Sequence, residues 1–204
     1  MKRFLLMLAL ICGVVSNFGL NSAFAAPAEK SNILIAYFSR AGEEYAIGSV
    51  KKGNTAIAAD IIAELTGGEL FQIRPEKEYP KNYKECTEVA SKEKATKARP
   101  KLLVDVADFD RYEIIFVGYP IWWGDMPMPV YTFLENHKFA GKKIIPFCTH
   151  GGSGLSSTDQ NITLACPGAK VLPGFEMIGK TVRNNPELAK TKISDWLKKI
   201  NYAN

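Results

Sequence analysis

The sequence predicts an α/β fold in which a parallel sheet lies between two layers of helices. Short apolar runs alternate along the chain with segments whose apolar residues recur at helical spacing, and this alternation is typical of strand–helix–strand units. Two of the runs, Ile33–Phe38 and Ile114–Val117, are apolar at almost every position. Strands of this composition are buried on both faces, as in a parallel sheet that is covered by helices on each side.

The first 25 residues have the pattern of a signal peptide that is removed on export. Two basic residues precede an apolar run over Phe4–Val15, and the small residues Ala23 and Ala25 mark a cleavage site. The apolar run is shorter than the ~20 residues that a membrane-spanning helix needs. We therefore expect cleavage after about Ala25, export through the general secretory route to the periplasm or the medium, and one domain over residues 26–204.

The charge of the expected mature chain argues against nucleic acid as a partner. The whole chain has 26 basic and 21 acidic residues. The signal segment contributes two of the basic residues and none of the acidic ones, so the net charge falls from +5 to +3 on cleavage. Lysine and glutamate are mixed along the chain, whereas a nucleic-acid-binding domain carries a concentrated basic surface. No later apolar run is long enough to span a membrane, so we expect no membrane segment after cleavage.

Cysteine and histidine are too few and too dispersed for a disulfide framework or a metal site. The mature chain keeps Cys86, Cys148 and Cys166, and an odd number of widely spaced cysteines favours buried free thiols. A bridge between Cys148 and Cys166 remains open in an oxidising compartment. The two histidines, His137 and His150, form no metal-binding motif with these cysteines.

The predicted elements follow one another in regular alternation. Strands are expected at 32–39, 70–73, 114–117, 143–148 and 171–178, and helices from 54 or 55 to 66, at 82–99, 130–136 and 156–164, and from 186 onward.

Three of these elements carry specific signals. The first helix can be capped by Asn54 or Thr55, and Gly67–Gly68 ends it. Pro173–Gly174 interrupts the fifth strand, so we expect this strand at the edge of the sheet. Asn185–Pro186 begins the last helix. The apolar face of that helix consists of Ile193, Trp196, Leu197 and Ile200. Trp196 is therefore expected in the core.

A polar segment connects the first strand to the first helix. Ser39–Gly42 follows the strand, Gly53–Thr55 stands at the helix start, and residues 43–52 separate the two. Hydroxyls, a small amide and unhindered N–H groups at a helix N-terminus suit a phosphate, because the helix dipole and the free donors both favour an anion. A plain N-cap beside a flexible loop is the alternative. The motifs GxGxxG and GxxxxGK[ST] are absent, which disfavours a dinucleotide-binding Rossmann site and a P-loop.

Two adjacent tryptophans follow the third strand. Pro120 ends this strand because it has no N–H to donate to the sheet, so Ile121–Gly124 is expected to form a loop. Trp122 and Trp123 cannot easily both enter the core. At least one of them should therefore present the flat face of its ring to a cavity, where a planar ligand can stack.

The loop after the fourth strand, Thr149–Gly154, has glycine at three of its last four positions. Glycine lets the backbone approach a ligand closely and direct N–H groups at it, although a flexible turn is the alternative. The carboxyl ends of parallel strands lie at one edge of the sheet, where open α/β sheets bind ligands. The three loops together therefore predict a site for a phosphorylated planar heterocycle.

Motifs in these loops resemble the flavodoxin family. They are Tyr37–Gly42 (YFSRAG) with Lys52–Thr55 (KGNT), Gly118–Pro127 (GYPIWWGDMP) and Pro146–Gly154 (PFCTHGGSG). The similarity extends from about Ile33 to the C-terminal helix and is to a bacterial branch of the family. It implies a flavodoxin-like three-layer sandwich, with a five-stranded parallel sheet in the order 2-1-3-4-5, and non-covalently bound FMN.

Carried over residue by residue, the resemblance implies FMN contacts in all three loops. The implied cofactor-binding residues are Ser39, Arg40, Gly53, Asn54 and Thr55 around the phosphate, Pro120, Ile121, Trp122, Trp123 and Gly124 beside the ring, and Thr149, His150, Gly151, Gly152, Ser153 and Gly154 at its pyrimidine edge. His150 has an alternative as a solvent-facing loop residue. The sequence departs from better-known flavodoxins in its slightly basic charge, in its expected export, and in the ten residues, 43–52, that interrupt the phosphate loop.

The implied function is electron transfer through FMN, either as a carrier or as a reductase that passes electrons to a small acceptor. The redox partner is then a protein or a small molecule, and NAD(P)H is an open electron donor. Flavin carries the electron chemistry itself, so no residue is expected to be catalytic, and Cys148 has no identifiable base to activate it. An exported binding module that keeps the fold without FMN is the alternative, since a fold alone does not fix a function.

Overall fold

A parallel sheet forms the centre of the part of the chain that the computed structural model describes, residues 31–203. Its strands are, in spatial order, β4 (Glu69–Gln72), β1 (Ile33–Tyr37), β5 (Ile114–Pro120), β6 (Lys143–His150) and β7 (Lys170–Val171), and β8 (Phe175–Ile178) pairs with the later part of β6. Every pairing in this sheet is parallel. The implied order 2-1-3-4-5 is confirmed, and the fifth strand is divided into β7 and β8 on either side of Pro173–Gly174.

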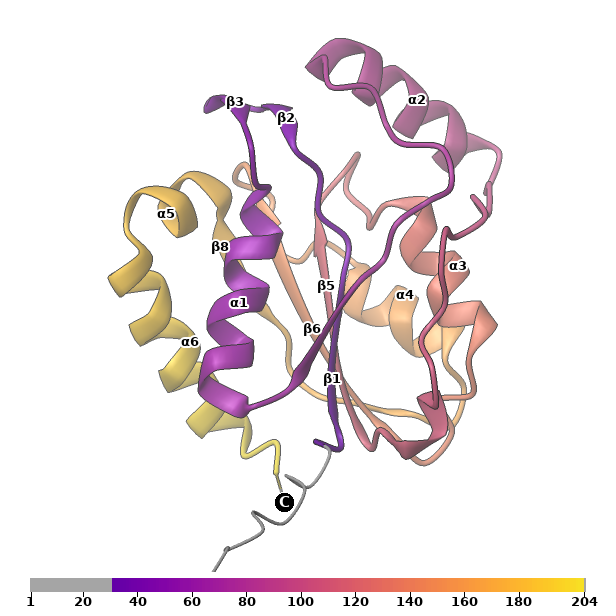
Figure 1. The fold of residues 1–204 in the computed structure, drawn as a ribbon, viewed down its shortest axis with the longest axis vertical. Helices are drawn as coiled ribbons and strands as arrows, with labels where there is room; N and C mark the ends of the chain where they lie inside the picture. The colour runs from indigo at the N-terminus through magenta and orange to yellow at the C-terminus, as the bar shows by residue number, and fades with distance from the viewer. Residues whose placement is uncertain (1–30, 204) are drawn as a thin grey trace, which may run out of the picture. The chain divides into compact units, whose positions relative to one another are not determined.

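Helices cover both faces of the sheet (Figure 1). The helices are α1 (Asn54–Thr66), α5 (Gly179–Asn184) and α6 (Pro186–Ile200) on one side, and α2 (Tyr83–Ala95), α3 (Met128–Asn136) and α4 (Thr158–Ala165) on the other. A short 3-10 turn, η1 (Phe109–Arg111), precedes β5. The predicted α/β class is therefore confirmed, with three layers.

The sheet separates two apolar cores, as the uninterrupted apolar runs predicted. Successive side chains of a strand point to opposite faces, so Ile115 and Val117 of β5 join the core beneath α3 and α4, whereas Phe116 joins the core beneath α1 and α6. Trp196 belongs to this second core, where its ring packs against Phe116 and Phe175. Its predicted burial is confirmed.

The segment between β1 and α1 has a regular structure that the sequence pattern did not predict. Strands β2 (Gly42–Glu44) and β3 (Gly48–Val50) form an antiparallel hairpin, which is a separate two-stranded sheet. Helix α5 was not predicted either, and α2 ends at Ala95 instead of continuing to residue 99. Short elements of this kind carry too few residues for a clear periodic signal.

Two further predictions concern the N-terminal segment and the cysteines. The expected signal peptide lies outside the described residues. Within residues 31–203, no helix has both the length and the apolar character that crossing a bilayer requires. Cys86, Cys148 and Cys166 are buried free thiols in the structure.

Candidate functional site

The three predicted loops meet at one edge of the sheet because their strands are neighbours. Strand β5 lies between β1 and β6, and Pro120 pairs with Thr149 where β5 and β6 end. The N–H of Ile121 donates to the carbonyl of Thr149 at 2.9 Å. The hydroxyls of Thr149 and Thr55 are 2.8 Å apart and buried. Backbone and side-chain hydrogen bonds thus join all three loops.

The N-terminus of α1 lies at this edge and is built around Gly53. Gly53 is the N-cap and provides no side-chain cap, so neither Asn54 nor Thr55 has the predicted capping role. A Cβ at residue 53 would lie 2.2 Å from the Ser39 hydroxyl and 2.4 Å from the Arg40 carbonyl, so only glycine fits. The Ser39 hydroxyl accepts a hydrogen bond from the N–H of Ala56. The first turn contains no acidic residue, and its N–H groups and dipole suit an anion.

A cation that the sequence pattern did not indicate stands beside this helix start. Arg183 of α5 donates from Nε to Oδ1 of Asn54 at 2.9 Å and from Nη2 to the carbonyl of Lys52. Its guanidinium therefore adds positive charge close to the N-terminus of α1. No local sequence signal indicates this position, because Arg183 follows Asn54 by 129 residues.

The guanidinium of Arg40, by contrast, braces the hairpin. It donates to the carbonyls of Pro80 at 2.8 Å and Lys81 at 3.1 Å, and to that of Glu43. Its Nε is buried without a hydrogen-bond partner. The N–H groups of Nη1 and Nη2 thus tie the hairpin to the segment before α2 and are not directed at the N-terminus of α1.

A cavity of about 240 Å³, which we call the edge cavity, lies among the three loops and the hairpin. The predicted site residues that line it are Asn54, Pro120, Ile121, Trp122, Thr149, His150 and Gly151. Several of the other predicted residues line neighbouring cavities. Ser39 lines a cavity beside β4, Trp123 lines a cavity beside α2, and Gly152–Gly154 line one beside β8.

Two tyrosines that were not predicted complete the walls of the edge cavity. Tyr45 is at the tip of the hairpin and Tyr83 is the first residue of α2. Their rings are 6.2 Å apart and tilted by 37°. A Cβ at Gly151 would lie 3.0 Å from the Tyr45 ring, so the glycine-rich loop and the hairpin are in close contact. The hairpin therefore places an aromatic ring over the ends of the strands.

The two tryptophans have different environments. Trp122 is half-buried, and its ring makes edge-to-face contacts with Phe38 and Tyr79 at centroid distances of 5.3 and 5.0 Å. Trp123 is 58% exposed and has a φ of +53°, a conformation that is unusual for a bulky residue. The indole N–H of Trp123 donates to the carbonyl of Thr87 at 3.0 Å, and Lys94 donates to the Trp123 carbonyl.

The glycine-rich loop is held by His150, whose side chain is only 5% exposed. Nδ1 of its imidazole accepts a hydrogen bond from the N–H of Gly152 at 2.9 Å, and Nε2 contacts the carboxylate of Glu176 on β8. Nδ1 must be unprotonated to accept, so Nε2 carries the proton and donates to Glu176. Nearby, burial raises the pKa of the Cys148 thiol to about 12, and this thiol donates to the carbonyl of Gly154.

A parallel sheet between two layers of helices, with a cavity at the carboxyl ends of its strands, is the arrangement of a flavodoxin-like protein. Comparison with known proteins leads to the same class. The family model described as flavodoxin matches residues 32–200. The chain therefore belongs to the flavodoxin family. No match is found among curated proteins.

Solved structures with the same fold include several flavoproteins. A protein from Bacteroides uniformis, assigned to the flavoproteins, is 29% identical over 81% of this chain and 99% of its own, with a TM-score of 0.65. A similarly assigned protein from Bacteroides eggerthii is 28% identical over 83% of this chain and 97% of its own, with a TM-score of 0.64. A flavoprotein from Lactobacillus acidophilus in complex with FMN shares 22% identity over 74% of this chain and 95% of its own, with a TM-score of 0.55.

Proposed function

We propose that the chain binds FMN non-covalently at the edge cavity and transfers electrons through it. One observation carries the proposal: a helix N-terminus and an aromatic cavity occur side by side at the carboxyl ends of adjacent strands. Asn54 belongs to both, because it is the first residue of α1 and also lines the edge cavity. A ligand that has both a phosphate and a planar ring matches this pair of features.

The residues around the site fit such a ligand. Gly53 allows the helix start to pack closely against Ser39 and the Arg40 carbonyl, and Arg183 adds a positive charge there. Trp122 and Tyr45 both offer aromatic surface to the edge cavity. Gly151 allows the third loop to pack closely against the ring of Tyr45. Bound FMN would supply the one- or two-electron chemistry, and the protein would fix the position of the ring and the charge around it.

The family supports this proposal, and one solved relative of the same fold was crystallised with FMN. The test is the visible spectrum of the purified protein, followed by titration with FMN. We expect either a yellow protein with two flavin bands or a colourless protein that takes up one equivalent of FMN. A colourless protein that refuses FMN would contradict the proposal and favour the flavin-free binding module.

Whether the protein is a carrier or a reductase depends on access of an electron donor to the ring. Anaerobic addition of NAD(P)H to the FMN-loaded protein separates the two. Rapid bleaching of the flavin bands identifies a reductase, whereas an unchanged spectrum together with reduction by dithionite identifies a carrier.

We also propose that the protein is exported and that residues 1–25 are removed. The pattern of basic, apolar and small residues supports the proposal. N-terminal sequencing of protein isolated from the producing cells should begin at about Ala26. A protein in the cytoplasm that retains Met1 would contradict it.

A further inference from the structure

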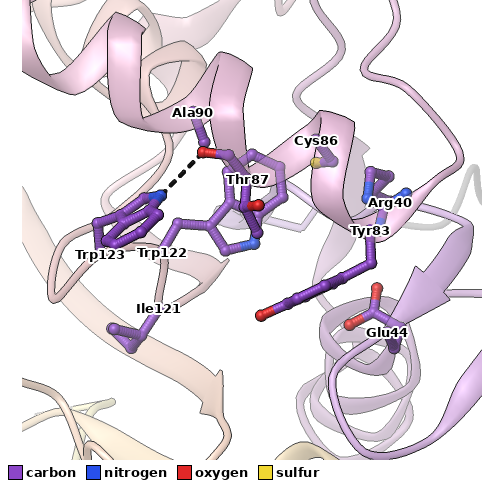
Figure 2. A pocket seen from close by; sticks show the side chains of 9 residues that line it. All are labelled: Arg40, Glu44, Tyr83, Cys86, Thr87, Ala90, Ile121, Trp122 and Trp123. Atoms are coloured by element: carbon purple, nitrogen blue, oxygen red, sulfur yellow. Dashed lines mark hydrogen bonds between the residues drawn. The ribbon is translucent and has the colours of Figure 1, made fainter.

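A second cavity, of about 320 Å³, lies between α2 and the tryptophan loop, and we call it the α2 cavity (Figure 2). Trp122 and Trp123 form one side, and Tyr83, Thr87 and Ala90 of α2 form the other. Three of these five side chains are aromatic. A flat aromatic molecule is the shape that such walls accommodate best.

The α2 cavity adjoins the edge cavity. Both are lined by Glu44, Tyr83, Ile121 and Trp122. The indole of Trp122 and the ring of Tyr83 thus contribute to both spaces. A molecule in the α2 cavity would be separated from a ring in the edge cavity by little more than these side chains.

Contacts with α2 hold Trp123 beside the α2 cavity. The positive φ of Trp123 belongs to a tight turn with Gly124, whose φ is also positive, and two backbone hydrogen bonds between Trp122 and Asp125 close this turn. The indole N–H donates to the carbonyl of Thr87, and the ammonium of Lys94 donates to the Trp123 carbonyl. These two hydrogen bonds fix an exposed indole against α2, so the wall that it forms is held in place.

The polar groups of the α2 cavity indicate which hydrogen bonds a ligand could make there. The Tyr83 hydroxyl points into the space toward Ile121 (Figure 2), and within residues 31–203 neither this hydroxyl nor the Glu44 carboxyl makes a hydrogen bond. Burial raises the pKa of Glu44 and that of Tyr83. Tyr83 therefore offers an O–H donor to a ligand.

The charges in the α2 cavity favour a neutral ligand. Arg40 and Glu44 both line it, so their charges oppose each other. The Arg40 guanidinium already donates to the carbonyls of Pro80 and Lys81, which leaves it poorly placed to bind an anion. A ligand that accepts a hydrogen bond from Tyr83 and has no net charge matches this set.

We propose that the α2 cavity binds a small, uncharged, planar aromatic molecule with carbonyl oxygens, of the quinone type. The proposal that this molecule binds in the α2 cavity depends only on the residues that line the cavity. The proposal that it accepts electrons there rests on the proposed FMN function, because the flavin would occupy the adjoining edge cavity.

The test uses 2,3-dimethyl-1,4-naphthoquinone, whose substituted ring does not add to thiols, in equilibrium dialysis with the oxidised, FMN-saturated protein. Thr87→Phe fills the α2 cavity without changing the backbone carbonyl that holds Trp123. Glu88→Phe places the same ring at the next, exposed position and is the matched control. We expect Thr87→Phe to weaken naphthoquinone binding at least about tenfold, and Glu88→Phe to leave it unchanged. Both variants should keep the FMN affinity of the parent.

A second comparison tests the hydrogen bond. Tyr83→Phe should weaken binding of the naphthoquinone about fivefold and leave binding of 2,3-dimethylnaphthalene, which lacks carbonyls, unchanged. Equal naphthoquinone affinity in Thr87→Phe and Glu88→Phe would overturn the inference. Naphthoquinone binding that occurs in the FMN-free protein and is lost on saturation with FMN would overturn it too, because the α2 cavity would then be part of the flavin site. Binding that depends on Thr87 in a protein that takes up no FMN would leave the binding site standing and remove its role as an acceptor site.

Discussion

The imidazole of His150 accepts a hydrogen bond from the backbone N–H of Gly152, two residues later in the same loop. Its other nitrogen donates to Glu176 on β8, so the side chain connects the glycine-rich loop to the sheet. A loop of this composition would otherwise be mobile. The neutral imidazole, rather than glycine content alone, therefore fixes the loop beside the edge cavity.

We expect His150→Leu to release this loop. The substitution removes the acceptor for the Gly152 N–H and leaves that group to solvent. The Gly152 amide should exchange with solvent about tenfold faster or more, as measured by NMR. Glu176→Gln is the control, because its amide oxygen can still accept from Nε2, so exchange at Gly152 should stay close to that of the parent. Equal exchange in His150→Leu and the parent would contradict the role of the imidazole.

Gly53→Ala should damage the start of α1. The added Cβ would contact the Arg40 carbonyl at 2.4 Å, and a backbone atom cannot move away as a flexible side chain can. We expect a loss of about 1–3 kcal/mol in the free energy of unfolding, measured by urea denaturation, together with weaker FMN binding. Ser49→Ala, on the exposed β3 strand, should change neither quantity. A fully stable Gly53→Ala protein would show that the helix start can relax.

The two tryptophans should respond differently to truncation. Trp122 lines the edge cavity and packs on Phe38 and Tyr79, whereas Trp123 lines the α2 cavity and is not among the lining residues of the edge cavity. Trp122→Ala should therefore lower both the stability and the FMN affinity, the latter about tenfold. Trp123→Ala should change FMN affinity little. Fluorescence titration with FMN measures the difference, and equal affinities in the two variants would argue against a role for Trp122 at the ring.

Arg183 should contribute to binding of the FMN phosphate and not to binding of the flavin ring. Its guanidinium stands at the N-terminus of α1 through Asn54 and the carbonyl of Lys52. Arg183→Gln should weaken binding of FMN while leaving binding of riboflavin, which lacks the phosphate, nearly unchanged. Lys190→Gln removes a cation that pairs with Glu64 on the outer surface and serves as the control for net charge. An equal loss for FMN and riboflavin would instead indicate a general disturbance of the site.

His137 should make the protein less stable at mildly acidic pH. Its ring stacks on Phe109 at 4.0 Å, and burial lowers its pKa, although the nearby Asp105 opposes this effect. The unfolded chain then binds the proton more readily than the folded one, so stability is full above the ordinary histidine pKa of about 6.5 and is lost as the pH falls below it. Compared with His137→Gln, the parent should lose more free energy of unfolding between pH 7 and pH 5 in urea titrations. Parallel losses in the two proteins would contradict this.

Much of the fold was predictable because each strand and long helix carries its own signal. Ile114–Val117 is apolar at every position, and the face of α6 that contains Trp196 has helical spacing. Such patterns depend only on near neighbours in the chain. The division of the fifth strand also followed from a local cause, the Pro173–Gly174 pair.

The candidate site was predictable only in part, because its walls come from distant segments. Trp122, Thr149 and Asn54 lie at strand ends or at a helix start, where position alone suggests a role. Tyr45 and Arg183 reach the same place from the hairpin and from α5, two short elements without a periodic pattern. Their roles depend on tertiary contacts, which local spacing does not encode.

The hairpin has a consequence for how this protein could diversify. Its two strands pair only with each other, so their length and sequence are not tied to the register of the six-stranded sheet. Substitutions at Tyr45 or Ile47 can therefore reshape what enters the edge cavity without repacking either core. The start of α1, confined by Ser39 and the Arg40 carbonyl, has no such freedom. Selection for a new ligand would be expected to alter the hairpin first and to leave the start of α1 unchanged.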